Sequence, residues 1–133
     1  MQSEFLMRIR AEFEEPRVLA GTPLGARRII TVKSGEFAGP GLEGKLLPGS
    51  GDWVLVRPDG VAELDIRFTL ATTEGSLIYM RSTGLLDAPR GYFRTSAVFE
   101  TGAEAHAHLN RLIAVGVGQR LPTGMATELH AVK

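Results

Sequence analysis

The sequence predicts an all-β protein, an antiparallel barrel or sandwich of about nine strands with one helix near the C-terminal end. Two observations carry this prediction. Apolar and polar side chains alternate along several segments with the period of two that a half-buried strand shows. In addition, 16 glycines and 7 prolines divide the 133 residues into short pieces. Because closure removes the exposed edges of a sheet, we favour the barrel, formed as a single domain by residues 1–133.

The strands are expected where alternating, β-branched or aromatic residues lie between turn signals. The first strand, residues 4–13, places Phe5, Met7 and Ile9 on one face. Residues 14–25 contain two prolines and two glycines and are expected to form a connection. The other eight strands, with a break at residues 34–35, are expected at residues 26–33, 36–47, 53–56, 61–72, 76–83, 92–100, 113–119 and 125–132.

The helix is expected over residues 102–112. Thr101 followed by Glu104 matches a capping box, in which the threonine oxygen accepts from an early backbone N–H and the glutamate reaches back. Several alanines and leucines, which are good helix formers, follow. His106 and Asn110 are four residues apart, so they share a face of this helix.

The composition excludes several classes of function. Without cysteine there are no disulfides, thiolate nucleophiles, zinc–thiolate sites or iron–sulfur clusters. Fifteen basic and fifteen acidic residues balance, which argues against a nucleic-acid partner. No apolar stretch approaches the ~20 residues of a membrane span, and the N-terminus has no signal-peptide core. The three histidines form no metal pattern. We therefore expect a cytoplasmic protein with no metal, no cofactor and no membrane partner.

Residues 39–44 read G-P-G-L-E-G, which matches the glycine pattern of a dinucleotide-binding loop. In such a site a helix follows the glycines, and its N-terminus holds the pyrophosphate. Here the next residues, 45–49, contain Pro48 and Gly49 and do not predict a helix. The segment is better explained as a bulged or sharply bent strand at a barrel corner.

Three polar groupings are candidates for a site. Asp52 and the only tryptophan, Trp53, follow a glycine-rich turn, so Asp52 is a candidate general base or ligand anchor and Trp53 a stacking surface. The alternative is an Asx-turn aspartate beside a core tryptophan. Asp65 and Arg67 share a strand face, as do Tyr92 and Arg94.

Each of these two strand pairs permits two interpretations. Inside a barrel, Asp65 and Arg67 would hold an anionic or hydroxylated ligand. On the outer face they would form a solvated ion-pair row, which the apolar character of the opposite face favours. Tyr92 beside Arg94 suits an acid or an oxyanion holder, but ordinary cross-strand packing explains this pair equally well.

Ordered motifs along the chain resemble a known family. They are G-E-F-A-G-P-G-L-E-G at residues 35–44, P-G-S-G-D-W at 48–53, D-G at 59–60, L-D-I-R at 64–67, Y-F-R-T at 92–95, F-E-T at 99–101 and L-N at 109–110. Together they resemble the bacterial and fungal family called domain of unknown function 3237. The resemblance implies a calycin-like or lipocalin-like antiparallel β-barrel with a helix near the C-terminal end. It implies no established activity.

The resemblance also gives weight to polar residues that packing alone would not require. These are Asp52, Trp53, Asp65, Arg67, Tyr92, Arg94 and Asn110. Two departures from the family pattern matter, and the one at the histidines bears on pocket polarity. Ser50 stands where the family has its second motif glycine, and His106 and His108 stand where aromatic residues usually precede the Leu-Asn pair.

We expect a barrel that binds a small organic molecule in its lumen, with anionic molecules among the candidates. In this hypothesis Trp53, Arg67, Arg94 and Asn110 contact the ligand. A second hypothesis is a cofactor-free acid–base enzyme of the lyase, isomerase or cyclase type. Its candidate catalytic residues are Asp52, Asp65 and Tyr92, with Arg67 or Arg94 stabilising an anion.

The third hypothesis is a structural or subunit-interaction barrel. A homo-oligomer is expected if the polar faces of the strands line the lumen and the apolar faces pack against another subunit. The binding and catalytic hypotheses require the polar candidates to converge on a cavity, whereas the structural hypothesis requires a barrel filled with side chains.

Overall fold

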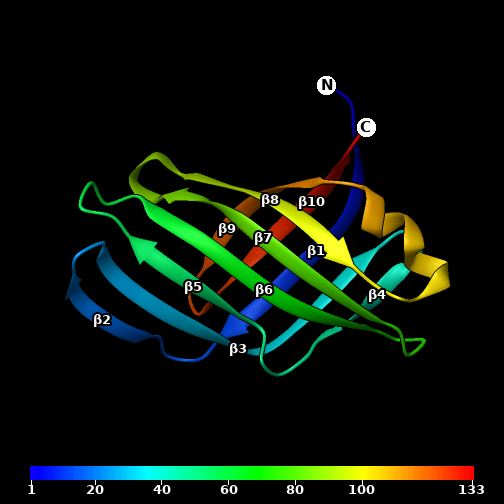
Figure 1. The fold of residues 1–133 in the computed structure, drawn as a ribbon, viewed down its shortest axis with the longest axis horizontal. Coiled ribbons are helices and arrows are strands. Elements are labelled where there is room, and N and C mark those ends of the chain that lie inside the picture. Colours follow the sequence, from blue (N-terminus) through cyan, green and yellow to red (C-terminus); the bar gives the residue numbers. More distant parts are fainter.

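The computed structural model describes residues 1–133 and contains ten antiparallel strands in one sheet (Figure 1). This confirms the predicted all-β barrel, with one strand more than expected. The strands are β1 (Ser3–Phe13), β2 (Arg17–Thr22), β3 (Gly25–Gly39), β4 (Leu42–Leu46), β5 (Gly51–Val56), β6 (Ala62–Thr72), β7 (Leu77–Asp87), β8 (Tyr92–Glu100), β9 (Ala114–Leu121) and β10 (Gly124–Val132). Two short 3₁₀ helices, η1 (Ala88–Arg90) and η2 (Glu104–Arg111), complete the chain.

Eight strands form the closed barrel. Their order is β1-β10-β9-β8-β7-β6-β4-β3, and pairing between β1 and β3 completes the ring. The two further strands lie at one end, where β5 bridges β3 and β6, and β2 pairs only with β3 (Figure 1). The helix η2 lies at the other end, so the two ends of the barrel differ in construction.

The longest strand, β3, turns the corner that closes the barrel. Its first half pairs with β2 and β5, and its second half pairs with β1 and β4. Gly35 lies in the second half, where a Cβ atom would stand 2.7 Å from the carbonyl oxygen of Arg10. Only glycine permits this approach of the two backbones. The break expected at residues 34–35 is therefore wrong, because this glycine brings strands together within a continuous strand.

The glycine-proline segment forms the hairpin between β3 and β4. Gly39 ends β3, and Gly41 adopts a left-handed φ of 66° in the turn before β4 begins at Leu42. A strand follows this turn, so no helix N-terminus is present to hold a pyrophosphate. The structure thus agrees with rejecting a dinucleotide site, although the segment is a tight hairpin instead of a bulge.

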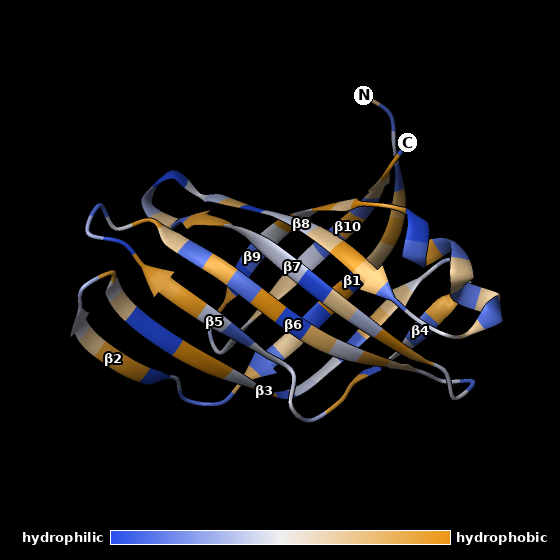
Figure 2. Ribbon diagram, in the orientation of Figure 1, coloured by the Kyte–Doolittle hydropathy of each residue, from blue (hydrophilic) through white to orange (hydrophobic).

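Apolar side chains face the inside of the barrel, because buried and less buried residues alternate along β6. Hydrophobic and hydrophilic residues alternate along the same strand in Figure 2. Four residues on that strand, Leu64, Ile66, Phe68 and Leu70, are at most 5% exposed. All eight barrel strands contribute to one buried apolar cluster. The polar faces therefore point to solvent, which is the reverse of the arrangement on which the homo-oligomer expectation was based.

Strand β2 was not predicted, because nothing in its sequence shows the alternation of a half-buried strand. Five of its six residues are exposed, including Val18 and Leu19. Its extended conformation comes from pairing with β3, with Arg17 opposite Ile29 and Leu19 opposite Arg27. The period-two pattern depends on one face of the strand being buried, so a strand outside the barrel wall does not show it.

The predicted helix is present as η2, but its geometry and its cap differ from the prediction. The segment is a 3₁₀ helix whose N-cap is Ala103, without a side-chain cap. Oγ1 of Thr101 donates to the carbonyl of Leu77 at 2.7 Å and accepts from the N–H of Ala103 at 3.1 Å, just before the helix. Asn110 holds the backbone of Thr101 from both sides, accepting from its N–H at 2.8 Å and donating to its carbonyl at 2.9 Å. The predicted capping box is therefore wrong, because Thr101 bonds ahead of the helix and Glu104 makes no return hydrogen bond.

No helix of the protein is both long enough and apolar enough to span a membrane.

Candidate ligand-binding site

A cavity of about 580 Å³ opens at the end of the barrel where β2 and β5 lie. Its walls come from the β1–β2 connection, β3, β5, β6, β7, β8 and the β9–β10 turn. More than half of the lining residues are hydrophobic, and the most deeply buried of them include Val54, Leu64, Phe93 and Met125. The volume lies within the ~300–1,000 Å³ that small-molecule sites occupy.

Asp52 is the only carboxyl group that is both buried and part of this cavity wall. It sits on β5 opposite Ile30 on β3 and Ile66 on β6, and it is 4% exposed. Oδ1 of Asp52 accepts a hydrogen bond of 3.0 Å from the backbone N–H of Asp65. Alternation along β5 turns Asp52, Val54 and Val56 toward the cavity.

Burial raises the pKa of Asp52 to about 7, because desolvation penalises the charged carboxylate. The backbone hydrogen bond from Asp65 acts in the opposite direction and lowers the pKa, while the negative charge of the Asp65 carboxylate raises it. Near pH 7, both protonation states of Asp52 are therefore populated. Such a group is able to donate or accept a proton, which makes Asp52 suited to hydrogen-bond or acid–base chemistry.

Asp65, Arg67 and Trp53 lie on the outer face of the sheet. The Asp65 and Arg67 side chains are 43% and 52% exposed and pair with each other at 3.5 Å. The guanidinium of Arg67 lies 5.8 Å from the ring centroid of Trp53. None of the three lines the cavity. The expectation that Asp65 and Arg67 converge on the lumen is wrong, because the apolar face of β6 fills the interior and leaves their face to solvent.

Tyr92 and Arg94 also point outward from β8. Tyr92 is 40% exposed, and the guanidiniums of Arg90 and Arg94 lie 5.5 and 5.3 Å from its ring centroid. Arg94 donates from Nη1 to the carbonyl of Phe93 at 3.0 Å. The ring of the intervening Phe93 lines the cavity instead. Tyr92 is therefore outside the reach of a ligand held beside Asp52, and its expected convergence with Asp52 is wrong.

Asn110 belongs to the far end of the barrel, on η2. Its side-chain amide is used by the two hydrogen bonds to Thr101, and it does not line the cavity near Asp52. Of the residues singled out in the sequence, the structure thus brings Asp52 alone to the main cavity. Any role of the others in binding stays a prediction without support from their positions.

Two arginines in the cavity wall were missed in the sequence. Arg28 on β3 shares an inward face with Ile30, and Arg120 stands at the end of β9 beside the β9–β10 turn. Glu14 and Glu15 also contribute to the rim and are exposed. The spacing of Arg28, Ile30 and Val32 was a usable signal, because residues two apart in a strand share a face.

Two glycines on β9 leave room for the side chains of the neighbouring strand. A Cβ atom on Gly118 would stand 2.4–2.6 Å from three ring carbons of Phe93. At Gly116 a Cβ would stand 2.2 Å from Oγ1 of Thr95. Gly118 allows Phe93 to lie across β9 as part of the cavity wall, so the shape of the cavity depends on this glycine.

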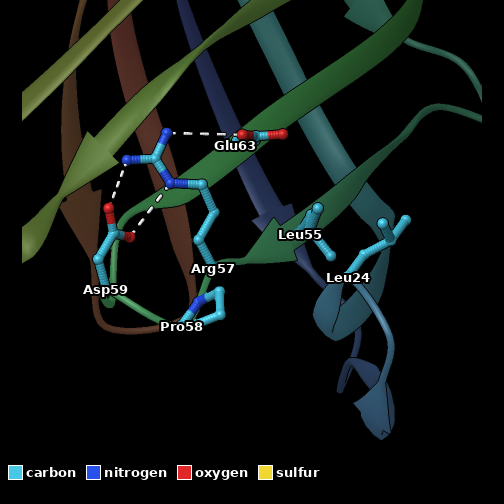
Figure 3. A pocket seen from close by; sticks show the side chains of 6 residues that line it. All are labelled: Leu24, Leu55, Arg57, Pro58, Asp59 and Glu63. Atoms are coloured by element: carbon cyan, nitrogen blue, oxygen red, sulfur yellow. Dashed lines mark hydrogen bonds and ion pairs between the residues drawn. The ribbon is translucent and has the colours of Figure 1, made fainter.

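A second depression, of about 490 Å³, lies on the outside near the β5–β6 turn (Figure 3). Its one guanidinium, Arg57, donates to both carboxylate oxygens of Asp59 at 3.1 and 2.6 Å and also pairs with Glu63 at 3.5 Å. Arg57 correspondingly lowers the pKa of the Asp59 carboxyl. Because these charges satisfy one another, this depression has no free group to hold a ligand.

A third hollow, of about 300 Å³, lies at the η2 end of the barrel (the closed end), between the β3–β4 and β6–β7 turns. Here Nε2 of the buried His106 forms a short hydrogen bond with Oε1 of Glu74. This bond ties η2 to the tip of the β6–β7 hairpin. The structure gathers no group of three or more histidine, aspartate or glutamate side chains that would hold a metal ion.

Comparison with known sequences confirms the resemblance seen in the motifs. The sequence profile of the family described as "Protein of unknown function (DUF3237)" matches residues 1–92 and 87–132. A UPF0311 protein of Rhodopseudomonas palustris is 27% identical over 148 residues, covering 99% of this chain and 97% of the relative. A UPF0311 protein of Clostridium acetobutylicum is 30% identical over 125 residues, covering 82% of this chain and 79% of the relative.

Solved structures share the barrel. A beta-barrel like protein from Acinetobacter baumannii superposes with a TM-score of 0.93 at 28% identity, covering 99% of this chain and 96% of the other. A structure described as an enzyme from Penicillium herquei superposes with a TM-score of 0.85 at 19% identity, covering 99% and 94%. At that identity the likeness shows a shared fold.

Proposed function

The chain belongs to the family of proteins of unknown function DUF3237, and we propose that it binds a small organic molecule in the open end of its barrel. The observation that carries the proposal is the position of Asp52, a buried carboxyl in the wall of an otherwise largely apolar cavity of about 580 Å³. Apolar walls supply affinity, and a few placed polar groups orient the ligand.

The packing around Asp52 supports a binding role over a purely structural one. A carboxyl that only completed the core would be expected to find several partners, yet Asp52 receives a single hydrogen bond from Asp65. Replacing it with an apolar residue would relieve the desolvation that raises its pKa. A ligand that donates a hydrogen bond to Asp52, or accepts one from it, offsets that cost.

The test is binding of a neutral fluorescent probe, N-phenyl-1-naphthylamine, to the purified protein. We expect enhanced emission that saturates with one site, and loss of this emission in Leu64→Trp, which fills the cavity. Val98→Trp, on the outer face of β8, is the matched control and should bind as the unaltered protein does. Equal emission from all three proteins would reject the cavity as the binding site.

A second candidate function is acid–base catalysis without a cofactor, favoured by the pKa of Asp52 near 7. In this function Asp52 is the single acid–base group, because Asp65 and Tyr92 point away from the cavity. The Penicillium herquei structure with the same fold is described as an enzyme. That likeness names no reaction, so the candidate depends on Asp52.

Proton exchange of a carbon acid tests this candidate. We expect the protein to accelerate exchange of the α-protons of 2-tetralone in deuterated buffer, followed by proton NMR, with a midpoint near pH 7. Asp52→Asn should lose the acceleration, whereas Glu100→Gln, which removes an exposed carboxylate on β8, should keep it. Equal exchange by Asp52→Asn and the unaltered protein would reject Asp52 as the base.

Three expectations from the sequence stay predictions. They are the cytoplasmic location, the closer relationship to calycins or lipocalins, and the homo-oligomer. For the last, the apolar residues still exposed on the outside of neighbouring strands, Leu85, Val98 and Val117, are the surface to examine. Light scattering at working concentration measures the oligomeric state directly.

A further inference from the structure

We propose that the ligand of the open-end cavity carries a carboxylate, held by Arg28 and Arg120 at the rim, with its apolar body directed toward Asp52 and Leu64. This inference rests on the proposed binding function and specifies the class of ligand. It is carried by two guanidinium groups that line one apolar cavity without a protein partner.

Seven of the twelve arginines form an ion pair or a side-chain hydrogen bond, and of the five that do not, only Arg28 and Arg120 line the open-end cavity. Arg27 donates to the carbonyl of Trp53 at 3.2 Å, Arg94 donates to that of Phe93, and Arg57 is held by two acids. Arg28 and Arg120 form no ion pair and no side-chain hydrogen bond to the protein, although Glu14, Glu15 and Asp52 line the same cavity. Arg28 is also half-buried on the inward face of β3. A partly desolvated guanidinium without a counter-ion is a ready site for an anion.

The chemistry of the guanidinium favours a carboxylate as that anion. Its planar fork of N–H donors matches the two oxygens of a carboxylate and makes charge-assisted hydrogen bonds. Glu14, Glu15 and Arg120 are exposed at the rim, so solvent screens their charges. Arg28 is the one half-buried charged group of the rim, and its charge is positive.

Strand register sets the direction of the ligand. Arg28 pairs with Val54 across the β3–β5 ladder, while Asp52 pairs with Ile30, two residues further into the barrel. At about 3.4 Å per residue, Asp52 lies about 7 Å deeper than Arg28 along the strand. A carboxylate at the rim thus leaves room for an apolar chain or ring between the arginines and Asp52, against Leu64 and Phe93.

Calorimetric titration with three matched compounds, octanoate, octanamide and octylamine, tests this inference at pH 6. We expect octanoate to bind at least tenfold more tightly than octanamide, and octylamine most weakly. Arg28→Gln should weaken octanoate binding by about tenfold, the amount expected for a charge-assisted hydrogen bond, and Arg120→Gln should weaken it less, because solvent screens the exposed Arg120. Arg81→Gln, which removes an exposed arginine from the outer face of β7, should change nothing.

Binding of octanamide to both cavity variants shows that they are folded and that the cavity is intact. Equal affinity for octanoate and octanamide would overturn the carboxylate assignment and leave the proposed binding function standing. Tightest binding of octylamine would also overturn it, and would indicate that Glu14 and Glu15 at the rim bind the charged end of the ligand. If none of the three compounds binds and N-phenyl-1-naphthylamine also fails, both proposals fall.

Discussion

The two ends of the barrel are built from the same strands, but their polar side chains differ in whether they have a partner within the protein. At the closed end, side chains such as Phe68 and Leu70 are fully buried, and His106 from η2 is bonded to Glu74. At the open end the strands enclose a cavity, and Arg28 and Arg120 in its wall have no protein partner. Polar groups at the closed end thus bond to one another, whereas the open end keeps groups free for a ligand.

The largest expected effect is on the free energy of unfolding, when a leucine at either end of β6 is replaced by alanine. Leu70→Ala, in the filled end, should lower the free energy of unfolding by about 4–5 kcal/mol, because the neighbours cannot close the new cavity. Leu64→Ala, in the wall of the existing cavity, should cost only about 2–3 kcal/mol. Urea unfolding measures both, and equal losses would contradict a hollow open end.

The next effect concerns the pH dependence of stability. The folded-state pKa of Asp52 is about 7, above its ordinary value of 3.8, so the folded protein holds a proton that the unfolded chain has released. The contribution of Asp52 to the free energy of unfolding is therefore greatest below about pH 4 and is lost as the pH rises through 7. By linkage the loss amounts to about 4 kcal/mol at most.

Asp52→Asn should remove that loss, because an asparagine amide does not ionise and still accepts the hydrogen bond from the backbone of Asp65. Relative to the unaltered protein, the variant should gain stability between pH 4 and pH 8. Glu100→Gln, which neutralises an exposed carboxylate on β8, is the matched control. A constant difference between Asp52→Asn and the unaltered protein at every pH would show that Asp52 is not desolvated.

A smaller effect tests how the cavity wall is shaped. Gly118→Ala places a Cβ against the ring of Phe93 and should destabilise the protein by about 2 kcal/mol through overpacking. It should also weaken binding of N-phenyl-1-naphthylamine, because Phe93 lines the cavity. Gly102→Ala, where a Cβ would meet nothing within 4 Å, should leave thermal unfolding and binding unchanged.

The smallest effect belongs to the closed end. His106→Ala removes the buried imidazole that bonds to Glu74 and should lower the free energy of unfolding by about 1 kcal/mol. Probe binding at the open end should persist, since the two sites lie at opposite ends of the barrel. Loss of probe binding in this variant would show that the ends are coupled, and faster amide exchange confined to η2 would agree with the account.

The sequence predicted most of the fold because one face of nearly every strand is buried. Alternation located β1, β6 and β8 to within one residue at each end. It could not find β2, which no core covers, or join residues 26–39 into one strand across Gly35. Strand pairing and backbone approach determine both features, and neither is local in sequence.

The candidate site was less predictable than the fold. Period two places Asp65 and Arg67 on a common face but does not say which face is inside. On β5 the inward-facing residue was harder to predict. Asp52 and Trp53 are neighbours and therefore face opposite sides of the sheet, and it is the polar residue, Asp52, that is buried. Arg28 and Arg120 lie 92 positions apart in the chain. Only closure of the barrel brings such residues to one cavity.

An NMR titration of the ¹⁵N-labelled protein with N-phenyl-1-naphthylamine tests the central claim most directly, because it reports every backbone amide at once. If the ligand binds in the open-end cavity, we expect chemical-shift changes at Asp52, Leu64 and Arg120 and little change around His106. Shift changes confined to the outer face around Trp53 and Arg67 would contradict it.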